Sequence, residues 1–219
     1  MRTSKKMAPR RGRPPSYDRE AALAAIRDVF WNRGFSATSL DDIAAATEMN
    51  RPSLYGAFGD KREMYLAALR MFAAESGRGM QQALEAPTLR EALEAFYARA
   101  IRDYLSGEAG PRGCLVVCTA ITEVTGDEAT RSAVATILAE LDSIVAARIA
   151  KAQSEGDRCS SGDAKVLARL ATSVLHSLAV RARAGASRSE LLTIARATVQ
   201  LLVGAASAAR PNTARSLPT

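Results

Sequence analysis

Arg51, Ser53 and Tyr55 lie close together near the start of a short predicted helix, and their side chains suit contacts with nucleic acid. Arginine forms a bidentate pair with guanine, while serine and tyrosine hydroxyls donate to bases or to phosphates. Leu54 and Phe58 are spaced to bury one face of that helix, so the three polar side chains are expected on the opposite, outward face. For Tyr55, packing is the alternative role. A helix presented in this way fits the major groove of double-stranded DNA.

The residues around this helix favour the same partner. Pro52 suits the first turn of the helix, and Gly56 is small enough to let the helix approach the floor of a groove. Lys61 begins the next helix, where its ammonium group and the free backbone amides both attract phosphate. Two hydroxyl residues precede the previous helix, where they either donate to phosphate or cap the helix. The predicted DNA contacts in this region are Thr38, Ser39, Arg51, Pro52, Ser53, Tyr55, Gly56 and Lys61.

A set of helices is predicted to position these side chains. The first runs from about Asp18, an N-cap candidate, to Arg33, and Gly34 ends it. Further helices are predicted over residues 40–46, 52–58 and 61–82. Two short helices joined by a tight turn, after a stabilising first helix, form a helix-turn-helix layout.

The same region resembles the N-terminal signature of the tetracycline-repressor (TetR) family. The most specific part is residues 53–61, where tyrosine, phenylalanine and lysine recur at three-residue steps. The resemblance implies an all-α protein, with an N-terminal three-helix helix-turn-helix DNA-binding domain and a helical ligand-binding and dimerisation domain. It also implies a bacterial transcriptional regulator, most often a repressor, that binds a palindromic operator as a homodimer. An unidentified small-molecule effector would release the operator. The matching residues are Ile26, Phe30, Gly34, Phe35, Thr38, Ser39, Leu40, Ile43, Ala44, Leu54, Tyr55, Phe58, Lys61 and Tyr65.

Two positions depart from the family pattern. Glu48 stands where the family usually has a turn glycine with positive φ. The turn is therefore expected to be strained or remodelled, at a cost of about 1 kcal/mol. Gly56 replaces a bulkier residue. Both changes leave the fold and DNA binding intact, but they prevent any operator sequence from being carried over from the family.

A basic N-terminal arm supplies most of the net charge of +7. Residues 1–19 carry seven basic side chains and one acidic one, whereas the remaining 200 residues carry 23 basic and 22 acidic side chains. Such an arm favours a polyanionic partner, nucleic acid first and anionic lipid second. Its Arg-Gly-Arg-Pro segment suits the narrow minor groove of A·T tracts, with non-specific phosphate contact as the alternative. The predicted contacts in the arm are Arg11 and Arg13.

The remainder of the chain is rich in alanine and poor in glycine and proline, which predicts longer helices. These helices are expected over residues 88–105, 163–184 and 188–207, with a further helix that follows Gly126 and Asp127 and ends near Ser154. Residues 113–124 are β-branched and almost uniformly apolar. Because no second strand candidate exists to pair with them, we predict a buried helix there. The predicted organisation is a disordered basic arm (1–16), a DNA-binding domain (17–65), a ligand-binding and dimerisation domain (66–208) and a flexible tail (209–219).

By resemblance, the middle helices enclose an effector pocket. His176, the only histidine, lies in an apolar helix, where a structural role is the alternative to ligand contact. Cys114 and Cys118 share a predicted helix face, which leaves open a regulator triggered by an oxidant or electrophile. The alternative is that they act as small apolar core residues. The predicted lining residues are Phe96, Tyr97, Tyr104, Cys114, Val117, Cys118, Ile121 and His176.

The last two predicted helices each carry an aliphatic stripe with small neighbours, which allows close approach of helices. In the family this pair forms a four-helix dimer interface, and an intramolecular core is the alternative. A two-fold symmetric protein also fits a palindromic operator. The predicted interface residues are Val166, Leu170, Val174, Leu178, Leu191, Ala195, Thr198 and Leu202.

Several classes of protein are disfavoured by the same sequence. No apolar run approaches the roughly 20 residues of a membrane span, and residues 1–16 lack the apolar segment of a secretory signal. Three cysteines are too few for a disulfide framework, so we expect a cytoplasmic protein without a membrane partner. The sequence has no P-loop, Gly-x-Ser-x-Gly segment or metal-ligand cluster. A helical enzyme is therefore a remote alternative, and no catalytic residue, metal or cofactor is expected.

Overall fold

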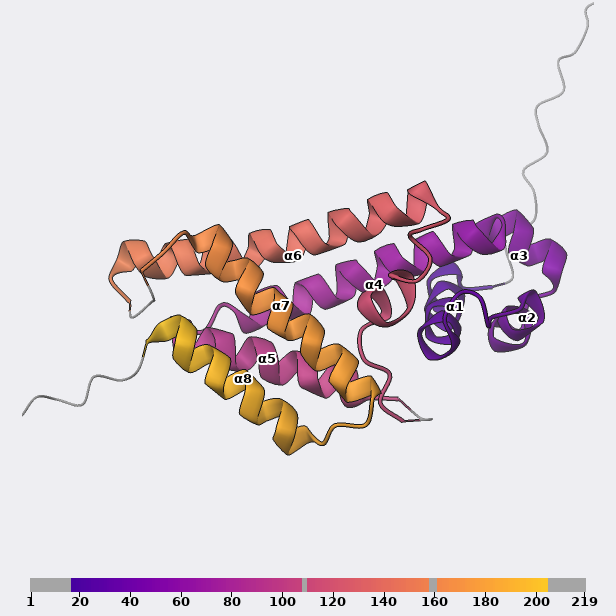
Figure 1. Cartoon of the computed structure of the whole chain (residues 1–219). Helices are drawn as coiled ribbons and strands as arrows, with labels where there is room; N and C mark the ends of the chain where they lie inside the picture. Colours follow the sequence, from indigo (N-terminus) through magenta and orange to yellow (C-terminus); the bar gives the residue numbers. More distant parts are fainter. Residues whose placement is uncertain (1–16, 108–109, 158–160, 205–219) are drawn as a thin grey trace, which may run out of the picture.

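The computed structural model describes residues 17–107, 110–157 and 161–204. Within these ranges every regular element is helical, which confirms the predicted all-α class (Figure 1). The predicted arm and tail lie outside the described residues. The elements are α1 (Arg19–Arg33), α2 (Leu40–Thr47), α3 (Arg51–Phe58), α4 (Lys61–Ala83), α5 (Leu89–Leu105), the π-helix η1 (Val116–Ala120), α6 (Glu128–Glu155), α7 (Ala164–Arg183) and α8 (Arg188–Val203).

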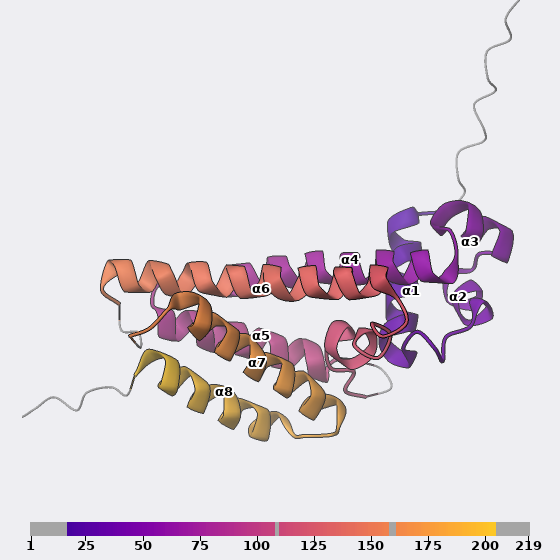
Figure 2. The same cartoon turned by 45° about the horizontal axis from the view of Figure 1, so that its top comes forward.

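Helices α1, α2 and α3 gather with the start of α4 at one end of the molecule (Figures 1 and 2). Their starts are fixed locally by side-chain caps. Asp18 accepts hydrogen bonds from the backbone amides of Glu20 and Ala21. Ser39 and Asp60 each form a capping box at the start of α2 and α4. The first helix begins and ends where the sequence predicts, and α4 extends from this end into the body of the molecule.

Aromatic side chains pack α1 against α4. Phe30 is fully buried, and its ring lies edge-on to that of Tyr65 with 4.9 Å between centroids. Two turns further along α4, the rings of Trp31 and Phe72 meet edge-on at 4.7 Å. Edge-to-face pairs at these distances are favourable because of the ring quadrupole. The N-terminal part of α4 is therefore held firmly by the first helix.

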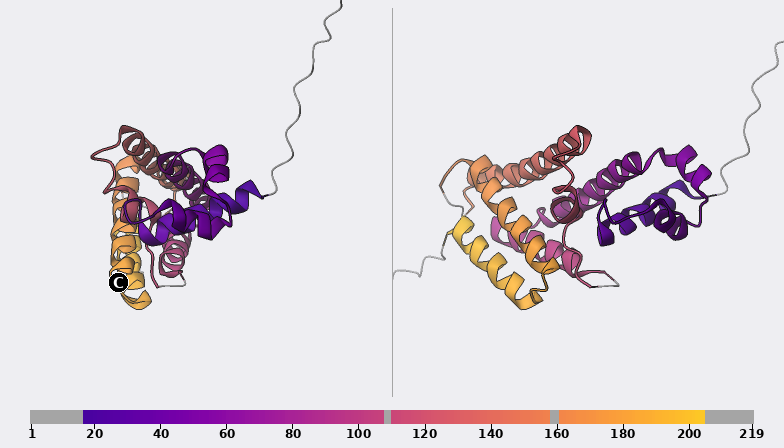
Figure 3. Two further views of the ribbon diagram at one scale, coloured as in Figure 1. Left: turned by 90° about the vertical axis from the view of Figure 1, so that its right-hand side faces the viewer. Right: turned by 45° about the vertical axis from the view of Figure 1, so that its right-hand side comes forward.

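The body of the molecule is built around α5, which packs against α4, α7 and α8. Helix α6 lies alongside α4 and also packs on α7 (Figure 2). Helices α7 and α8 form an outer layer on one side, seen edge-on at the left of the end view (Figure 3, left). Phe96 and Tyr97 are buried in the centre, and the Tyr97 hydroxyl donates to the carbonyl oxygen of Ala171 at 2.9 Å.

The predicted buried helix over residues 113–124 is only partly correct. Leu115 and the five-residue π-helix η1 are helical, and Leu115, Val116, Thr119 and Ala120 are buried. Turns follow from residue 121 to residue 126, and Ile121 is 50% exposed. The Ile121 amide donates to the carbonyl oxygen of Val116, which is the wide i to i+5 spacing of a π-helix. Such short π-helices are frequent at functional sites.

Candidate DNA-reading surface and interior cavity

The outer face of α3 carries the side chains that the sequence singles out. Arg51, Pro52, Ser53, Tyr55 and Gly56 are exposed, whereas Leu54 and Phe58 are buried against the rest of the domain. Asn50 caps the helix by accepting from the Ser53 amide, and proline occupies the first turn. The N-terminal half of α3 is thus free to enter a groove.

Arg51 donates hydrogen bonds from two of its guanidinium nitrogens to Asp41 in the first turn of α2. Its Nε lies 3.0 Å from Asp41 Oδ1, and its Nη2 lies 2.7 Å and 2.6 Å from Oδ1 and Oδ2. This hydrogen bonding raises the pKa of Arg51, so the guanidinium is always charged. Sequence reasoning missed this partner, because ten residues and two helix ends separate the pair.

The two hydroxyl residues before α2 have different environments. Thr38 is 2% exposed and its hydroxyl donates to the carbonyl oxygen of Gly34 at 2.7 Å, so it has no free hydroxyl for phosphate. The expectation of a phosphate contact from the Thr38 side chain is therefore wrong. Ser39 is exposed and caps α2, donating to Asp42 and accepting from its amide. The hydrogen bonds from Ser39 lower the pKa of Asp42.

The start of α4 carries two cations, Lys61 and Arg62, which contact different parts of the molecule. The Lys61 ammonium lies 4.4 Å from the centre of the Phe35 ring, a cation–π contact that orients the side chain. Arg62 forms an ion pair at 2.8 Å with Asp127, the N-cap of α6. Arg11 and Arg13, also predicted to contact DNA, lie outside the described residues.

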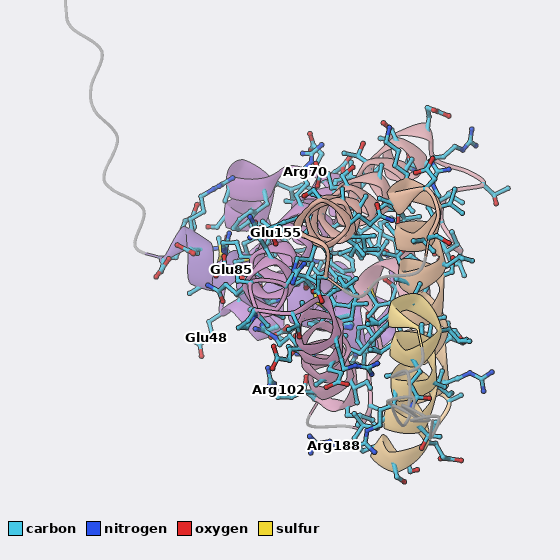
Figure 4. The ribbon with its side chains drawn as sticks, turned by 90° about the vertical axis from the view of Figure 1, so that its left-hand side faces the viewer. Glu48, Arg70, Glu85, Arg102, Glu155 and Arg188 are labelled. Atoms are coloured by element: carbon cyan, nitrogen blue, oxygen red, sulfur yellow. The ribbon has the colours of Figure 1, made fainter. Side chains whose placement is uncertain are left out.

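Glu48 keeps the conformation of the glycine it replaces. It adopts φ 54° and ψ 25° at the end of α2, the left-handed region that non-glycine residues rarely enter. It is the one non-glycine residue with positive φ in the described ranges. The following residue, Met49, is buried, and its amide bonds to the carbonyl oxygen of Ala44. The turn is therefore strained and not remodelled, with the Glu48 side chain projecting outward (Figure 4).

A cavity of about 90 Å³ is lined by residues of α1, α4, α5, α6 and α7 and by Cys114, Val116 and Val117. Of the residues predicted to line it, Tyr104, Cys114, Val117 and His176 do so. The other predictions are wrong: Phe96 and Tyr97 are buried in the α5 core, while Cys118 and Ile121 lie away from the cavity. The lining residues that sequence reasoning missed include Trp31, Phe72, Met80, Ile137, Leu141 and Ile144. The helical spacing of Ile137, Leu141 and Ile144 on α6 could have indicated a shared apolar face. Nothing in the local sequence around Trp31 indicated its place in the lining.

The polar groups in this cavity are predominantly uncharged. Burial raises the pKa of Tyr104 well above its ordinary value and raises the pKa of the Cys114 thiol to about 11. Burial lowers the pKa of His176, which keeps its imidazole neutral at pH 7. The carboxylate of Asp103, which also reaches the lining, is paired with Arg99 at 2.7 Å. The other carboxylate in the lining, Glu140, is exposed to solvent, and the rest of the wall is apolar or neutral, which favours an uncharged guest.

One stretch of chain ties the cavity to the DNA-proximal helices, and we call residues 112–127 the junction segment. Trp31 Nε1 donates to the carbonyl oxygen of Gly113 at 3.1 Å, and the Arg112 guanidinium lies 3.7 Å from the centre of the indole ring. Three further contacts join this segment to the DNA-proximal end. They are Ser36–Glu123 at 3.1 Å, Arg62–Asp127 at 2.8 Å and Tyr65–Thr119 at 3.0 Å.

Arg183, at the end of α7, reinforces this junction. Its Nη1 donates to the carbonyl oxygens of Trp31 and Arg112, and its Nη2 donates to that of Asn32. Gly113 has φ 64°, and a Cβ added there would lie 2.6 Å from the carbonyl oxygen of Ala179. Only glycine therefore lets the junction segment pass this close to α7.

The predicted dimer-interface stripe divides in two. Leu178, Leu191, Ala195 and Leu202 are buried within the chain, so they are not free to meet a partner as predicted. The reason is that α8 packs its apolar stripe onto α5. Val166 and Leu170 are 52% and 55% exposed, while Val174 and Thr198 are half-buried. Two exposed residues on the same helices were missed, Val180 and Leu201.

Other kinds of site find no support in the described ranges. They hold no group of three or more histidine, cysteine, aspartate or glutamate side chains arranged to bind a metal ion. No helix among them has the length and apolarity to cross a membrane.

The fold and the exposed α3 define a helix-turn-helix protein with a cavity in its helical body. A family model for bacterial regulatory proteins of the tetR family matches residues 22–68. The solved structure of a triple-cysteine mutant of the TetR family transcriptional regulator CifR, bound to 26-base-pair operator DNA, is similar. It is 32% identical, with a TM-score of 0.79, and the match covers 87% of this chain and all of that one.

Further relatives agree. A second CifR structure, a double-cysteine mutant with operator DNA, is 33% identical with a TM-score of 0.78, and 86% of this chain and 98% of that chain are covered. The transcriptional repressor ComR of Escherichia coli K12 is 29% identical over 195 residues, which cover 87% of this chain and 91% of ComR. The chain belongs to the TetR family. It is a DNA-binding transcriptional regulator of this family, which is a family of regulators and not of enzymes.

Proposed function

We propose that this regulator is a homodimeric repressor that releases a palindromic operator when a small molecule occupies the cavity. The observation that carries the proposal is that Trp31, on the first helix of the DNA-binding domain, forms part of the cavity wall. A guest in the cavity therefore contacts the domain that binds DNA. Repression is supported by two relatives, the transcriptional repressors ComR and BdcR of Escherichia coli K12. Because the partner is chromosomal DNA, we place the protein in the cytoplasm.

The cavity supports a particular class of effector. Its volume of about 90 Å³ is below the roughly 150 Å³ of an engineered cavity that holds benzene, so the guest is small or the walls move apart around it. Tyr104, Cys114 and His176 offer neutral hydrogen-bonding groups. We therefore propose a small, uncharged, mostly apolar molecule with one or two polar atoms.

Release requires that the guest favour a conformation with a different placement of α3. The junction segment supplies a route for this coupling. Its residues Cys114, Val116 and Val117 line the cavity, while Gly113 and Thr119 hold Trp31 and Tyr65. A guest that displaces this segment alters the support of α1 and of the start of α4. The shift is limited by the difference in the guest's affinity for the two conformations.

The outer layer of α7 and α8 supports dimerisation. Val166, Leu170 and Val180 share one stripe of α7 by helical spacing and are each more than half exposed. Leu201 on α8 is 79% exposed. Exposed aliphatic side chains gathered on adjacent helices are typical of a surface that meets a partner. We propose these four residues as the centre of the interface, with the DNA-binding domain over residues 17–65 and the ligand-binding and dimerisation domain from residue 66 onward.

Binding to DNA and response to a guest are tested together. The wild-type protein selects a duplex from a randomised pool, and fluorescence anisotropy then compares that duplex with random DNA. We expect two protomers per duplex and a preference of about a thousandfold. A panel of small uncharged alcohols, ketones and aromatic compounds is then screened by two readouts. These are the emission of Trp31, the only tryptophan, and the loss of anisotropy.

A cavity-filling variant provides the control. Gly77 lines the cavity, and a Cβ added there meets no atom within 4 Å, so Gly77→Leu fills space without a clash at Cβ. We expect it to bind the selected duplex normally and to ignore the compound that releases the wild type. Ala74→Leu is the matched control, since Ala74 is exposed on the same helix. A compound that changes Trp31 emission but leaves DNA bound would contradict ligand release while leaving DNA binding intact.

A reactive effector is the second candidate, favoured by the position of Cys114 in the cavity wall. In this version the Cys114 proton passes to solvent and the thiolate adds to an electron-poor C=C bond of the guest. The C–S bond forms as the C=C π bond breaks, and the neighbouring carbon takes up a proton from solvent. Burial opposes it by raising the pKa of this thiol to about 11. Replacing Cys114 by alanine separates the two candidates. Unchanged release excludes the reactive effector, and loss of release together with a mass adduct on the wild type would support it.

A further inference from the structure

Arg51 and Asp41 form an ion pair with several hydrogen bonds on the proposed DNA-reading surface. The aspartate takes hydrogen bonds from Nε and Nη2, which together form one side of the guanidinium. Within the described part of the chain, the Nη1 amino group has no acceptor. Nη2 donates to both carboxylate oxygens, so the Nη1 amino group is the part of the guanidinium that stays open. Nη1 can donate to the O6 or N7 atom of guanine, and a second, parallel hydrogen bond forms when Nη2 turns one hydrogen from Asp41 to the base.

Both side chains are exposed, which gives Asp41 a second effect. An unpaired carboxylate at this place would repel DNA phosphates, and an unpaired Arg51 would attract any phosphate within reach. The pair cancels both charges at long range while it leaves the hydrogen-bonding edge available. A free arginine on a flexible stem binds DNA of any sequence, whereas a held arginine binds well only where a guanine meets it.

We propose that Asp41 is a specificity-determining residue, which positions Arg51 for guanine and withholds it from phosphates. The proposal rests on the proposed role of α3 as the helix that reads the operator. Other acidic side chains nearby have different tasks. Asp42 caps α2 and pairs with Arg33, while Glu48 forms the turn. Asp41 contacts no other cation than Arg51 in the described ranges.

The test compares the affinity for the selected duplex with that for random DNA at several salt concentrations. We expect Asp41→Ala to bind random DNA several-fold more tightly and to lose about tenfold of its preference for the selected duplex. Its salt dependence on random DNA should steepen by about 0.9 in log–log slope, because Arg51 gains one phosphate. Asp41→Asn, which keeps one acceptor, should lie between Asp41→Ala and the wild type. Circular dichroism and thermal melting show whether each variant is folded.

Two controls distinguish the positioning of Arg51 by Asp41 from a general effect of removing a negative charge. Glu48→Gln removes an exposed carboxylate from the other end of α2, and we expect it to leave the preference unchanged. In an Arg51→Ala background, Asp41→Ala should have no further effect on the preference. An equal loss in that background, or an unchanged preference in Asp41→Ala alone, would overturn the proposal. A wild-type protein that prefers no sequence would overturn the proposed function, and this inference with it.

Discussion

The indole nitrogen of Trp31 donates a hydrogen bond to the carbonyl oxygen of Gly113, 3.1 Å away and 82 residues later in the chain. Trp31 is on the first helix of the DNA-binding domain, and Gly113 lies in the junction segment, which lines part of the cavity. The ring itself is part of the cavity wall. This single contact therefore connects the place where an effector would sit with the helix that supports the DNA-reading end.

Trp31→Phe should weaken this connection. The variant keeps an aromatic ring beside Phe72 but loses the hydrogen bond and weakens the contact with Arg112. We expect a loss of about 1–2 kcal/mol in the free energy of unfolding and faster amide hydrogen exchange in residues 113–120. Operator affinity without effector should stay close to that of the wild type, while release by the effector becomes less complete.

The matched control for this variant is Tyr97→Phe. It also removes a buried hydrogen bond, to the carbonyl oxygen of Ala171, but in the core of the body. We expect a similar loss of stability with normal release. If both variants release DNA equally well, Trp31 does not couple the cavity to the DNA-binding domain.

Glu48→Gly should stabilise the protein. Glu48 occupies the left-handed region, where a side chain costs about 1 kcal/mol or more and glycine costs little. Part of this gain is offset because glycine has more freedom in the unfolded chain, so we expect about 0.5–1 kcal/mol in urea unfolding. Glu48→Ala removes the same charge and keeps the strain. Equal stability of the two variants would rule out backbone strain at this turn.

The stability of the protein should fall as the pH is lowered through the titration of His176. Burial lowers the pKa of this imidazole from its ordinary value of 6.5, although Asp142 partly opposes the shift. The unfolded chain therefore binds a proton at a higher pH than the folded one, and stability is lost below about pH 6.5. The slope cannot exceed about 1.4 kcal/mol per pH unit for one group.

Because His176 is the only histidine, its proton NMR signal gives the folded pKa without assignment of others. A value at or above 6.5 would contradict the prediction. His176→Gln should flatten the dependence of unfolding free energy on pH between about 5 and 7, where carboxylates contribute little.

A charge on the outer layer should separate the protomers. We expect Leu170→Glu and Leu201→Glu to shift the protein from dimer to monomer in sedimentation equilibrium, because each buries a carboxylate without a partner. Operator affinity should fall with dimerisation, since one half-site is then bound alone. Gln81→Glu adds the same charge at an exposed position of α4 and should leave the dimer unchanged. A persistent dimer in both leucine variants would place the interface elsewhere.

Much of the DNA-reading end could be predicted from the sequence. Helix starts follow from cap residues whose side chains accept hydrogen bonds from backbone amides two or three residues later. Asp18, Ser39 and Asp60 are examples. The exposed face of α3 follows from the spacing of Leu54 and Phe58. These are local relations, and a short stretch of chain contains all the groups that decide them.

The cavity and the outer layer depended on tertiary structure. An aliphatic stripe such as Leu191, Ala195 and Leu202 can face the chain's own core or a partner, and only the packing of α8 on α5 turns it inward. The predictions of a phosphate contact for Thr38 and of a cavity position for Phe96 were wrong for the same reason, because burial is decided by distant elements.

The sequence by itself determined the helices outside residues 113–124, their caps and the residues that α3 presents. Only the tertiary structure decided that Trp31 meets Gly113 and that Asp41 holds Arg51. Each of these contacts joins groups from different elements, and its geometry depends on how whole helices pack. Local spacing contains no information about that packing, because many arrangements bury the same apolar stripes equally well.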